Sequence, residues 1–213
     1  MKQKRARSEE DKAVQIKKIT DTARDLYLDD RKQFTMRTIA RKLGMSQGNL
    51  YNYWSSKREL WYAIIKADFK EFEEGMKAIV QEHHGLFIDL TDKLADYYFS
   101  FAKSNFRRYQ MMFVFPPPLA EKEESDAIVY EPGSIIILMK IVQKAVENGE
   151  LIPLDVQKLA LYFWSLVHGT TLVSNTTLFS PEAKIAQFGT AKEFQSFVKK
   201  LVRKQMEQFL AKK

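Results

Sequence analysis

The sequence predicts an all-α protein with an N-terminal three-helix domain, built on a helix-turn-helix, and a larger C-terminal helical domain. Apolar residues recur at helical spacing along most of the chain, and no alternating strand pattern of useful length occurs. The 213 residues include only 8 Gly and 6 Pro, which argues against a β-rich fold with many turns. About nine helices are therefore expected, with no internal repeat among them.

Positive charge is concentrated at the N-terminal end. Residues 1–60 hold 15 of the 34 Lys and Arg but only 8 of the 27 Asp and Glu, so they carry the whole formal net charge of +7. Residues 61–213 carry equal numbers of the two signs. Because phosphate neutralisation supplies most sequence-independent DNA affinity, this asymmetry favours a nucleic-acid partner at the N-terminal end.

The composition argues against several other classes of protein. The absence of cysteine excludes a disulfide framework and a thiolate metal site, and it fits a cytoplasmic protein. No apolar segment follows the basic N-terminus, and no run reaches the roughly 18 to 20 apolar residues of a spanning helix, so neither a signal peptide nor a membrane protein is expected. The 3 His lack carboxylate partners at suggestive spacing and no Gly-rich phosphate loop occurs, so we expect no enzyme, cofactor or metal.

The first predicted helix follows a short basic arm that could enter a minor groove or stay disordered in solvent. The arm consists of Lys2, Lys4, Arg5 and Arg7. The helix is expected from Ser8, a candidate N-cap, to about Leu28. Its apolar stripe consists of Ala13, Ile16, Ala23, Leu26 and Tyr27.

The next segment carries the start and stop signals of three further helices. Thr35 and Ser46 are placed as N-caps, and Gly44 between them can take the left-handed conformation that ends a helix. Ser56 and Glu59 form an S-x-x-E capping box ahead of a longer apolar run. A helix, a three-residue turn and a second helix are the layout of a helix-turn-helix that reads DNA.

The second of these helices presents side chains suited to DNA. Gln47 and Asn49 can pair bidentately with adenine in the major groove, and Gly48 lets the backbone come close. Tyrosine hydroxyls, and Lys57 at a helix N-terminus, suit phosphate oxygens. Alternatively, these are ordinary solvated residues on a short helix. The predicted DNA-binding set is Thr35, Arg37, Ser46, Gln47, Gly48, Asn49, Tyr51, Asn52, Tyr53 and Lys57.

Residues 35–60 resemble the DNA-binding signature of the TetR family of bacterial and archaeal transcription regulators. The positions that match at the family's spacing are Thr35, Ile39, Ala40, Gly44, Ser46, Leu50, Tyr51, Tyr53, Ser56, Lys57 and Leu60. Trp54 stands where the family usually carries Phe, a like-for-like core aromatic. The resemblance implies a homodimer whose N-terminal domains each read half of a palindromic double-stranded DNA operator. It also implies a C-terminal domain that dimerises and binds a small-molecule effector.

The expected function is therefore a repressor that a small apolar or aromatic effector releases from its operator. An activator, or a ligand-independent regulator of the same fold, is the alternative. A long helix from Lys57 to about Glu82 is expected to link the DNA-binding domain to the effector-binding domain. The predicted divisions are residues 1–56 for the DNA-binding domain, 57–82 for the connecting helix, and 83–213 for the effector-binding and dimerisation domain.

Several helical segments are expected after this link. They are Leu86–Ser104, a continuation or shorter helix over Asn105–Phe115, Ile128–Val146, Asp155–Asn175, a short segment from Ser180 to Gly189, and a last helix from Ala191 to the end. An acidic loop at 121–126 separates the segment Asn105–Phe115 from the helix Ile128–Val146. The apolar faces of the last two long helices exceed what one partner covers, which favours a dimer through a four-helix bundle.

Aromatic and Met side chains are abundant in the C-terminal part, and such residues line cavities for apolar ligands, although they equally fit a plain core. The segment Trp164–Gly169 resembles a W-x-x-x-H-G signature of one TetR subgroup. Trp164 and His168 lie one turn apart and could simply pack, or His168 could contact a ligand. The predicted effector set is Tyr97, Tyr98, Phe101, Tyr109, Met112, Phe113, Phe163, Trp164 and His168.

Overall fold

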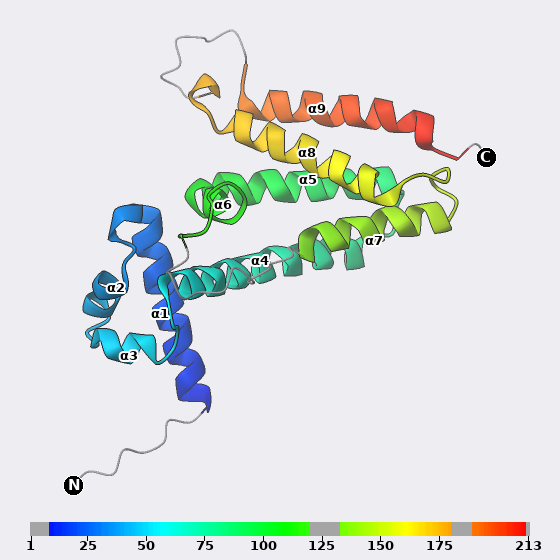
Figure 1. Ribbon diagram of the computed structural model, residues 1–213. Helices are drawn as coiled ribbons and strands as arrows, with labels where there is room; N and C mark the ends of the chain where they lie inside the picture. The colour runs from blue at the N-terminus through cyan, green and yellow to red at the C-terminus, as the bar shows by residue number, and fades with distance from the viewer. Residues whose placement is uncertain (1–8, 120–132, 180–188, 212–213) are drawn as a thin grey trace. The chain divides into compact units, whose positions relative to one another are not determined.

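The computed structural model describes residues 9–119, 133–179 and 189–211, and their regular structure is helical (Figure 1). The α-helices are α1 (Glu9–Asp29), α2 (Met36–Lys42), α3 (Gln47–Tyr51), α4 (Lys57–Glu82), α5 (Phe87–Ser104), α6 (Phe106–Phe113), α7 (Gly133–Glu147), α8 (Val156–Ser174) and α9 (Ala191–Met206). Short 3-10 segments are η1 (Arg31–Gln33), η2 (Thr177–Phe179) and η4 (Glu207–Phe209). The predicted all-α fold is confirmed for the described part of the chain.

Several predicted features lie outside the described residues. They are the basic arm at residues 2–7, the N-cap at Ser8, the acidic loop at 121–126, the start of the helix predicted from Ile128, and the segment at 180–188. The helix predicted over Ile128–Val146 is described from Gly133 and ends at Glu147. Between α5 and α6 the helix breaks at Asn105, whose carbonyl Oδ1 accepts from the Arg108 N–H at 3.1 Å, so α6 is a separate helix.

The chain divides into two compact units, and the division falls inside two helices. One unit comprises Met1–Asp68 and Gln110–Tyr130, and the other comprises Phe69–Tyr109 and Glu131–Lys213. Both α4 and α6 therefore contribute to both units. The helix expected as the link is α4, and α6 is a second link because the residues at its end belong with the first unit. The predicted domain boundaries at residues 56 and 82 stay a prediction.

The first unit is a small core made by α1, α2, α3 and the start of α4. Ile19, Ile39 and Leu50, one each from the first three helices, have no exposed surface. Fully burying a side chain of this kind stabilises the fold by roughly 1.5–3 kcal/mol. The predicted α1 stripe is wrong at its start, because Ala13 and Ile16 are exposed and the buried face begins at Ile19.

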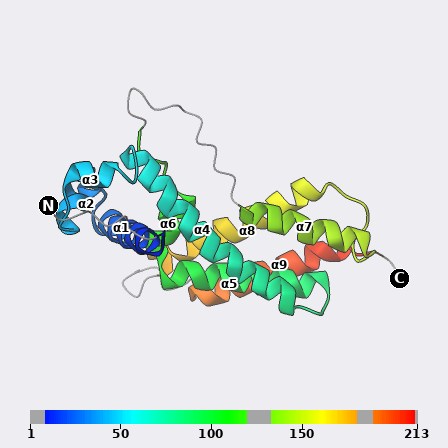
Figure 2. The ribbon, with the colours of Figure 1, turned by 90° about the horizontal axis from the view of Figure 1, so that it is seen from below.

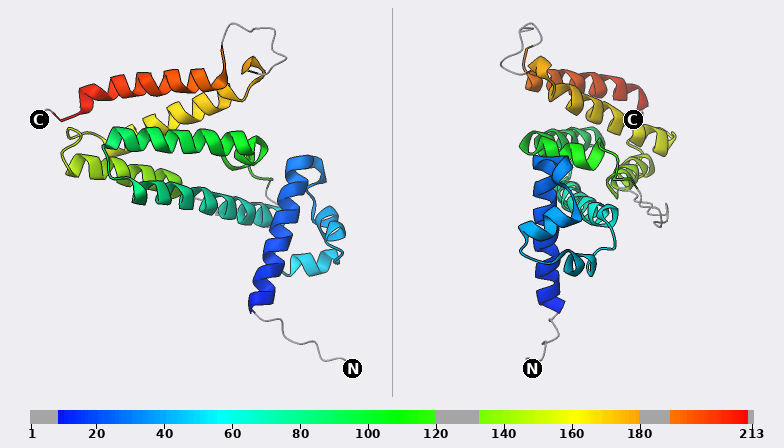
Figure 3. Two further views of the ribbon diagram at one scale, coloured as in Figure 1. Left: turned by 180° about the vertical axis from the view of Figure 1, so that it is seen from behind. Right: turned by 60° about the vertical axis from the view of Figure 1, so that its left-hand side comes forward.

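The second unit packs α5, α7, α8 and α9 with the end of α4, and α9 lies along α8 (Figures 2 and 3). Ion pairs align α9 with α5. Lys199 Nζ lies 2.7 Å from the Asp96 carboxylate, and Arg203 Nη2 lies 2.6 Å from Asp89 and 2.9 Å from Asp92. Exposed pairs of this kind stabilise by less than about 1 kcal/mol each, so their main effect is on the register of the two helices.

Two contacts between distant residues lie at helix ends, and the sequence pattern predicted neither contact. The Glu150 carboxylate accepts from the backbone N–H of Phe87 at 2.7 Å, at the start of α5, where the helix has no side-chain cap of its own. The last helix was expected to continue to the end of the chain, but it stops at Met206. After it, Leu210 forms an isolated antiparallel bridge with Leu151, which attaches this part of the chain to the α7–α8 connection.

Candidate DNA interface and ligand pocket

Two side-chain caps and one glycine define the helix-turn-helix of the first unit. Thr35 Oγ1 accepts from the N–H of Thr38 at 3.1 Å, and Ser46 Oγ accepts from the N–H of Asn49 at 3.2 Å. Gly44, in the turn between α2 and α3, has a φ of 65°, a conformation that residues with a Cβ rarely adopt. The predicted caps and turn are confirmed, and each cap stabilises its helix by roughly 1 kcal/mol.

The capping box at the start of α4 differs from the prediction in one bond. Ser56 Oγ accepts from the N–H of Glu59 at 3.0 Å, as expected. The Glu59 carboxylate, however, accepts from the backbone N–H and the hydroxyl of Ser55, at 2.6 and 2.7 Å. Ser55 offers two donors to this carboxylate where the expected box offers one backbone N–H, and α4 still begins at Lys57.

Helix α3 turns its apolar residue inward and its polar residues outward. Leu50 is fully buried, whereas Gln47 and Gly48 are exposed and Tyr51 is 40% exposed. A Cβ added at Gly48 would meet nothing within 4 Å, so the space outside this backbone position is open. An open polar helix face after a short turn is the surface that a helix-turn-helix presents to a DNA groove.

The predicted DNA-binding residues all lie in this unit. Seven are exposed: Thr35, Arg37, Ser46, Gln47, Gly48, Tyr51 and Asn52. Asn49, Tyr53 and Lys57 are half-buried. The hydroxyls of Thr35 and Ser46 already serve as helix caps, so any DNA contact they make is additional to that role. The assignment of these residues to DNA stays a prediction.

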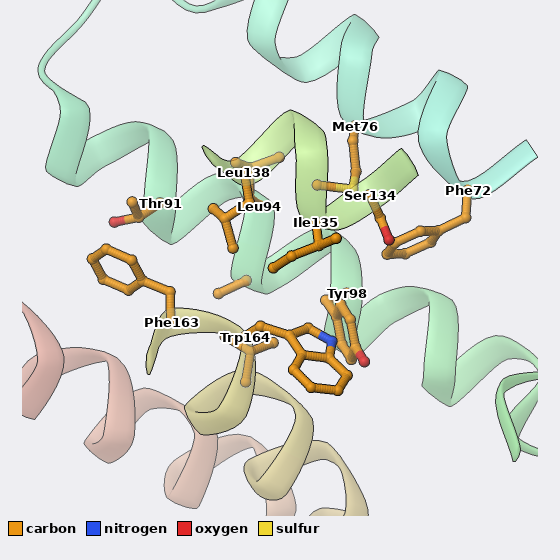
Figure 4. A pocket seen from close by; sticks show the side chains of 12 residues that line it. Phe72, Met76, Thr91, Leu94, Tyr98, Ser134, Ile135, Leu138, Phe163 and Trp164 are labelled. Carbon is orange, nitrogen blue, oxygen red and sulfur yellow. The ribbon is translucent and has the colours of Figure 1, made fainter. Parts of the chain in front are cut away.

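A pocket in the second unit is lined by 12 residues from α4, α5, α7 and α8 (Figure 4). They are Phe72, Met76, Thr91, Leu94, Ala95, Tyr98, Ser134, Ile135, Leu138, Phe163, Trp164 and Val167. None of these side chains is charged. The cavity volume is ≈ 60 Å³, well below the roughly 150 Å³ of an engineered apolar cavity that binds benzene. The site is therefore apolar and nearly filled by its own side chains.

Three of the nine predicted effector residues, Tyr98, Phe163 and Trp164, line this pocket. The other six do not line it: Tyr97, Phe101, Tyr109, Met112, Phe113 and His168. Sequence reasoning missed the contributions of α4 and α7. A signal existed on α4, where Phe72 and Met76 are spaced to share one face, but only the fold brings α7 against them.

Tyr97 lies outside the pocket because it packs against a glycine of α4. Its hydroxyl donates to the Phe72 carbonyl at 3.2 Å, and its ring stacks on the Phe72 ring with centroids 5.2 Å apart. A Cβ added at Gly75 would lie 2.1 Å from the Tyr97 hydroxyl oxygen. Gly75 therefore admits the tyrosine against α4, and the stacked tyrosine supports the Phe72 wall of the pocket.

A hydrogen-bonded cluster joins α5, α6 and α8 at one wall of the pocket. His168 Nδ1 lies 3.0 Å from the Tyr98 hydroxyl and 2.7 Å from the Tyr109 hydroxyl. The two hydroxyls also bond each other, and Trp164 is a hydrogen-bond partner of Tyr98. The Trp164 ring stacks on His168 with centroids 5.1 Å apart. We call Trp164, Tyr98, Tyr109 and His168 the tyrosine–histidine cluster.

Burial sets the protonation of this cluster. Desolvation lowers the pKa of His168 below its ordinary value of 6.5, so the imidazole is neutral at pH 7. Desolvation raises the pKa of Tyr109 to about 12 and that of Tyr98 well above its ordinary range, so both hydroxyls stay protonated. The cluster is therefore uncharged at neutral pH, like the pocket beside it.

Helices α8 and α9 expose large apolar side chains. Phe197 is 57% exposed, Leu201 on the next turn of α9 is 45% exposed, and Leu161 on α8 is 51% exposed. Further exposed apolar residues on α8 are Tyr162, Trp164 and Val173. Apolar surface of this kind marks an interaction site when it is contiguous. Within the described residues, no helix combines the length and the apolar character that crossing a membrane requires.

Comparison with known proteins identifies the first unit. Residues 19–64 match the model of bacterial regulatory proteins of the tetR family. Similar solved structures include a protein of unknown function from Rhodococcus sp. RHA1, with 18% identity, complete coverage of both chains (100% each) and a TM-score of 0.72. A TetR/AcrR regulator from Thermobifida fusca YX-ER1 is 18% identical over 88% of this chain and 96% of that chain, with a TM-score of 0.61.

The transcriptional regulator FadR from Bacillus subtilis, solved in complex with stearoyl-CoA, is also similar. It is 17% identical over 86% of this chain and 95% of that chain, with a TM-score of 0.64. At these identities the likeness to solved structures shows a shared fold. A search of curated proteins returned no match. Membership of the W-x-x-x-H-G subgroup stays a prediction.

Proposed function

We propose that this chain, a DNA-binding transcriptional regulator of the tetR family, is a homodimeric repressor that leaves a palindromic operator when an apolar effector binds. The observation that carries the proposal is the combination of a capped helix-turn-helix on the basic part of the chain with an uncharged pocket in the second unit. The alternatives, an activator or a ligand-independent regulator, share this fold and differ in the response to the effector.

Residues of α3 and of the start of α4 support the DNA-binding part of the proposal. Gln47 and Asn49 flank the open backbone of Gly48 on α3, so amide groups and close backbone approach are available on one short helix. Lys57 at the start of α4 adds a cation at a helix N-terminus, where backbone N–H groups also favour phosphate. These positions support base reading by α3 and phosphate binding by α4.

The pocket defines the chemistry of the effector. Its lining lacks charge, so the part of the effector that it holds is apolar. Its volume of ≈ 60 Å³ favours a narrow hydrocarbon chain over a ring, because a chain enters when flexible Met76 and Leu138 side chains move. The FadR structure that shares this fold holds stearoyl-CoA, whose acyl chain is of this type. We therefore propose an effector with an acyl or alkyl chain.

The apolar surface on α8 and α9 supports the proposed homodimer. Leu161, Phe197 and Leu201 are each more than two-fifths exposed on two helices that pack together. A second copy of the same pair of helices buries these side chains in a four-helix arrangement around a two-fold axis. This matches the two-fold symmetry that a palindromic operator requires.

A mobility-shift assay with the DNA upstream of the chain's own gene tests the DNA-binding proposal. We expect a discrete complex that survives excess random DNA and weakens as salt rises. Equal competition by random DNA contradicts sequence-specific regulation. A reporter under that upstream DNA then separates repression, in which deleting the regulator raises expression, from activation, in which deletion lowers it.

Titration with stearoyl-CoA tests the effector proposal, with free CoA as the control for the head group. We expect a change in tryptophan emission from Trp164 and a loss of operator binding at the same concentration, with no effect of free CoA. Ile135→Phe should block both effects because Ile135 lines the pocket, whereas Ile136→Phe, on an exposed neighbour, should preserve them. Binding that leaves operator affinity unchanged contradicts the proposed release.

A further inference from the structure

The tyrosine–histidine cluster has a consistent order of donors when His168 is neutral and carries its proton on Nε2, which leaves Nδ1 as an acceptor. An indole N–H can only donate, so the Tyr98 oxygen accepts from Trp164. A neutral imidazole nitrogen has one lone pair, and the shorter distance of 2.7 Å assigns it to the Tyr109 hydroxyl. The Tyr109 oxygen in turn accepts from Tyr98. His168 is therefore the final acceptor on which the orientation of both tyrosines depends.

Two members of the cluster line the pocket and two lie behind its wall. Tyr98 and Trp164 line the pocket, and Figure 4 shows the Trp164 indole beside the Tyr98 ring. Tyr109 has no exposed surface, and the His168 ring lies against both Trp164 and Tyr109. Because this interior is close-packed, an occupant that moves Tyr98 or Trp164 must stretch or break the bonds to Tyr109 and His168.

Tyr109 also stands at the point where α6 leaves the second unit. It is the last residue of the second unit on this helix, and Gln110 is the first residue that belongs to the first unit. Beyond α6, the Phe115 ring lies 4.0 Å from the guanidinium carbon of Arg31 in η1. Arg31 precedes Thr35, the N-cap of α2. A shift of Tyr109 therefore has a covalent route into the first unit that is independent of α4.

We propose that His168 is a positioning residue that couples the pocket to α6, by holding Tyr109 through one nitrogen while Tyr98 and Trp164 sense the occupant. The biological meaning of this coupling rests on the proposed function. His168 does not touch the effector in this arrangement. Its place one turn after Trp164 lets one helix supply both the sensing indole and the acceptor that holds Tyr109.

A cavity-filling substitution tests the coupling without knowledge of the effector or the operator. Ala95→Leu, at a residue that lines the pocket, stands in for an occupant. Amide hydrogen exchange of Gln110–Phe113 is measured in the full chain for Ala95→Leu, Tyr109→Phe and the double variant. We expect each single variant to speed exchange about 10-fold and the double variant to be no faster than Tyr109→Phe alone.

Tyr97→Phe is the matched control, because it removes a neighbouring tyrosine hydroxyl that is outside the cluster. It should leave exchange in α6 unchanged. If Ala95→Leu does not fold, Leu138→Phe at another lining position takes its place. Effects that multiply in the double variant, or an α6 that does not respond to either single change, overturn the proposal.

Replacement of the acceptor separates positioning from mere packing. His168→Asn places an amide oxygen near the position of the imidazole Nδ1 and should keep exchange in α6 slow, whereas His168→Leu keeps bulk without an acceptor and should resemble Tyr109→Phe. Equal behaviour of the two variants contradicts a role for the acceptor. These measurements need neither DNA nor effector, so a failed operator assay leaves their outcome interpretable, and they can fail while the operator assay succeeds.

Discussion

Arg24 of α1 and Asp68 of α4 form a two-pronged ion pair inside the first unit. Arg24 Nη2 lies 2.8 Å from Asp68 Oδ1, and Nε lies 3.2 Å from Oδ2. The Asp68 side chain has no exposed surface, while that of Arg24 is 19% exposed and also contacts Asp21 at 2.8 Å. The pair fixes the packing of α1 against α4 at the last residue of α4 that belongs to this unit.

The two ends of this pair should respond unequally to substitution. Arg24→Met removes the guanidinium partner of a carboxylate that has no exposed surface, and should lower the free energy of unfolding by about 3 kcal/mol. Asp68→Leu leaves an arginine that water can still reach, so its cost should be smaller. The double variant should recover much of the loss, because an apolar pair of similar size carries no desolvation penalty. Urea unfolding measures all three, and equal costs for the two single variants contradict the asymmetry.

Residues at the start of α3 and α4 should affect DNA binding in different ways. Lys57→Ala should weaken binding to operator and random DNA alike and reduce the salt slope by about one charge. Gln47→Ala or Asn49→Ala should cost roughly 1–3 kcal/mol on the operator only. Fluorescence anisotropy with both DNAs at several salt concentrations distinguishes the two patterns. A Lys57 variant that loses discrimination but retains affinity for random DNA is not a phosphate-contact variant.

The proposed dimer should depend on the exposed apolar side chains of α9. Phe197→Glu combined with Leu201→Glu should give monomers in sedimentation at concentrations where the unchanged chain is dimeric, since two carboxylates cannot be buried in an apolar interface. Leu86→Glu is the control, because Leu86 is 60% exposed in the same unit but on neither helix. A double variant that stays dimeric places the interface elsewhere.

Removal of the chain from Ala191 should also give monomers. This test is less direct, because Met206 of α9 has no exposed surface and its loss opens the core of the second unit. Circular dichroism must therefore show that the shortened chain stays helical before its sedimentation is interpreted. The paired glutamates avoid this difficulty, since both sites are on the surface.

Acid should destabilise the protein through His168. The folded state lowers the pKa of this histidine below its ordinary value of 6.5, so the unfolded state binds the proton more readily as pH falls. The stabilising contribution is complete above pH 6.5 and is lost as pH falls through the folded pKa. Tyr98 and Tyr109 face the imidazole and stay protonated throughout, because burial raises the pKa of each.

The free energy of unfolding should therefore decline more steeply between pH 7 and acid for the unchanged chain than for His168→Gln. The comparison cancels the contribution of every titratable group that both chains share. The stability difference measured by urea unfolding at each pH reports His168 alone. Parallel pH profiles for the two chains contradict a half-buried histidine that is neutral at pH 7.

The sequence alone determined the helix-turn-helix and the all-α fold class. Thr35, Gly44 and Ser46 act through bonds and backbone conformations within a few residues of themselves, so their effect is visible in local spacing. The boundaries of α8 follow for the same reason, since Asp155 caps its start by accepting from the N–H of Lys158. Features of this kind do not depend on what the rest of the chain does.

The tertiary structure alone decided which aromatic residues surround the pocket. Tyr97 and Tyr98 are neighbours in sequence, yet only Tyr98 lines the pocket, because Gly75 on a distant part of α4 admits Tyr97 elsewhere. The pairing of His168 with Tyr109 likewise joins residues from two helices that are far apart in the chain. Helical periodicity shows which face of a helix is apolar, but the neighbour that covers that face is set by packing between elements, and a local pattern does not encode it.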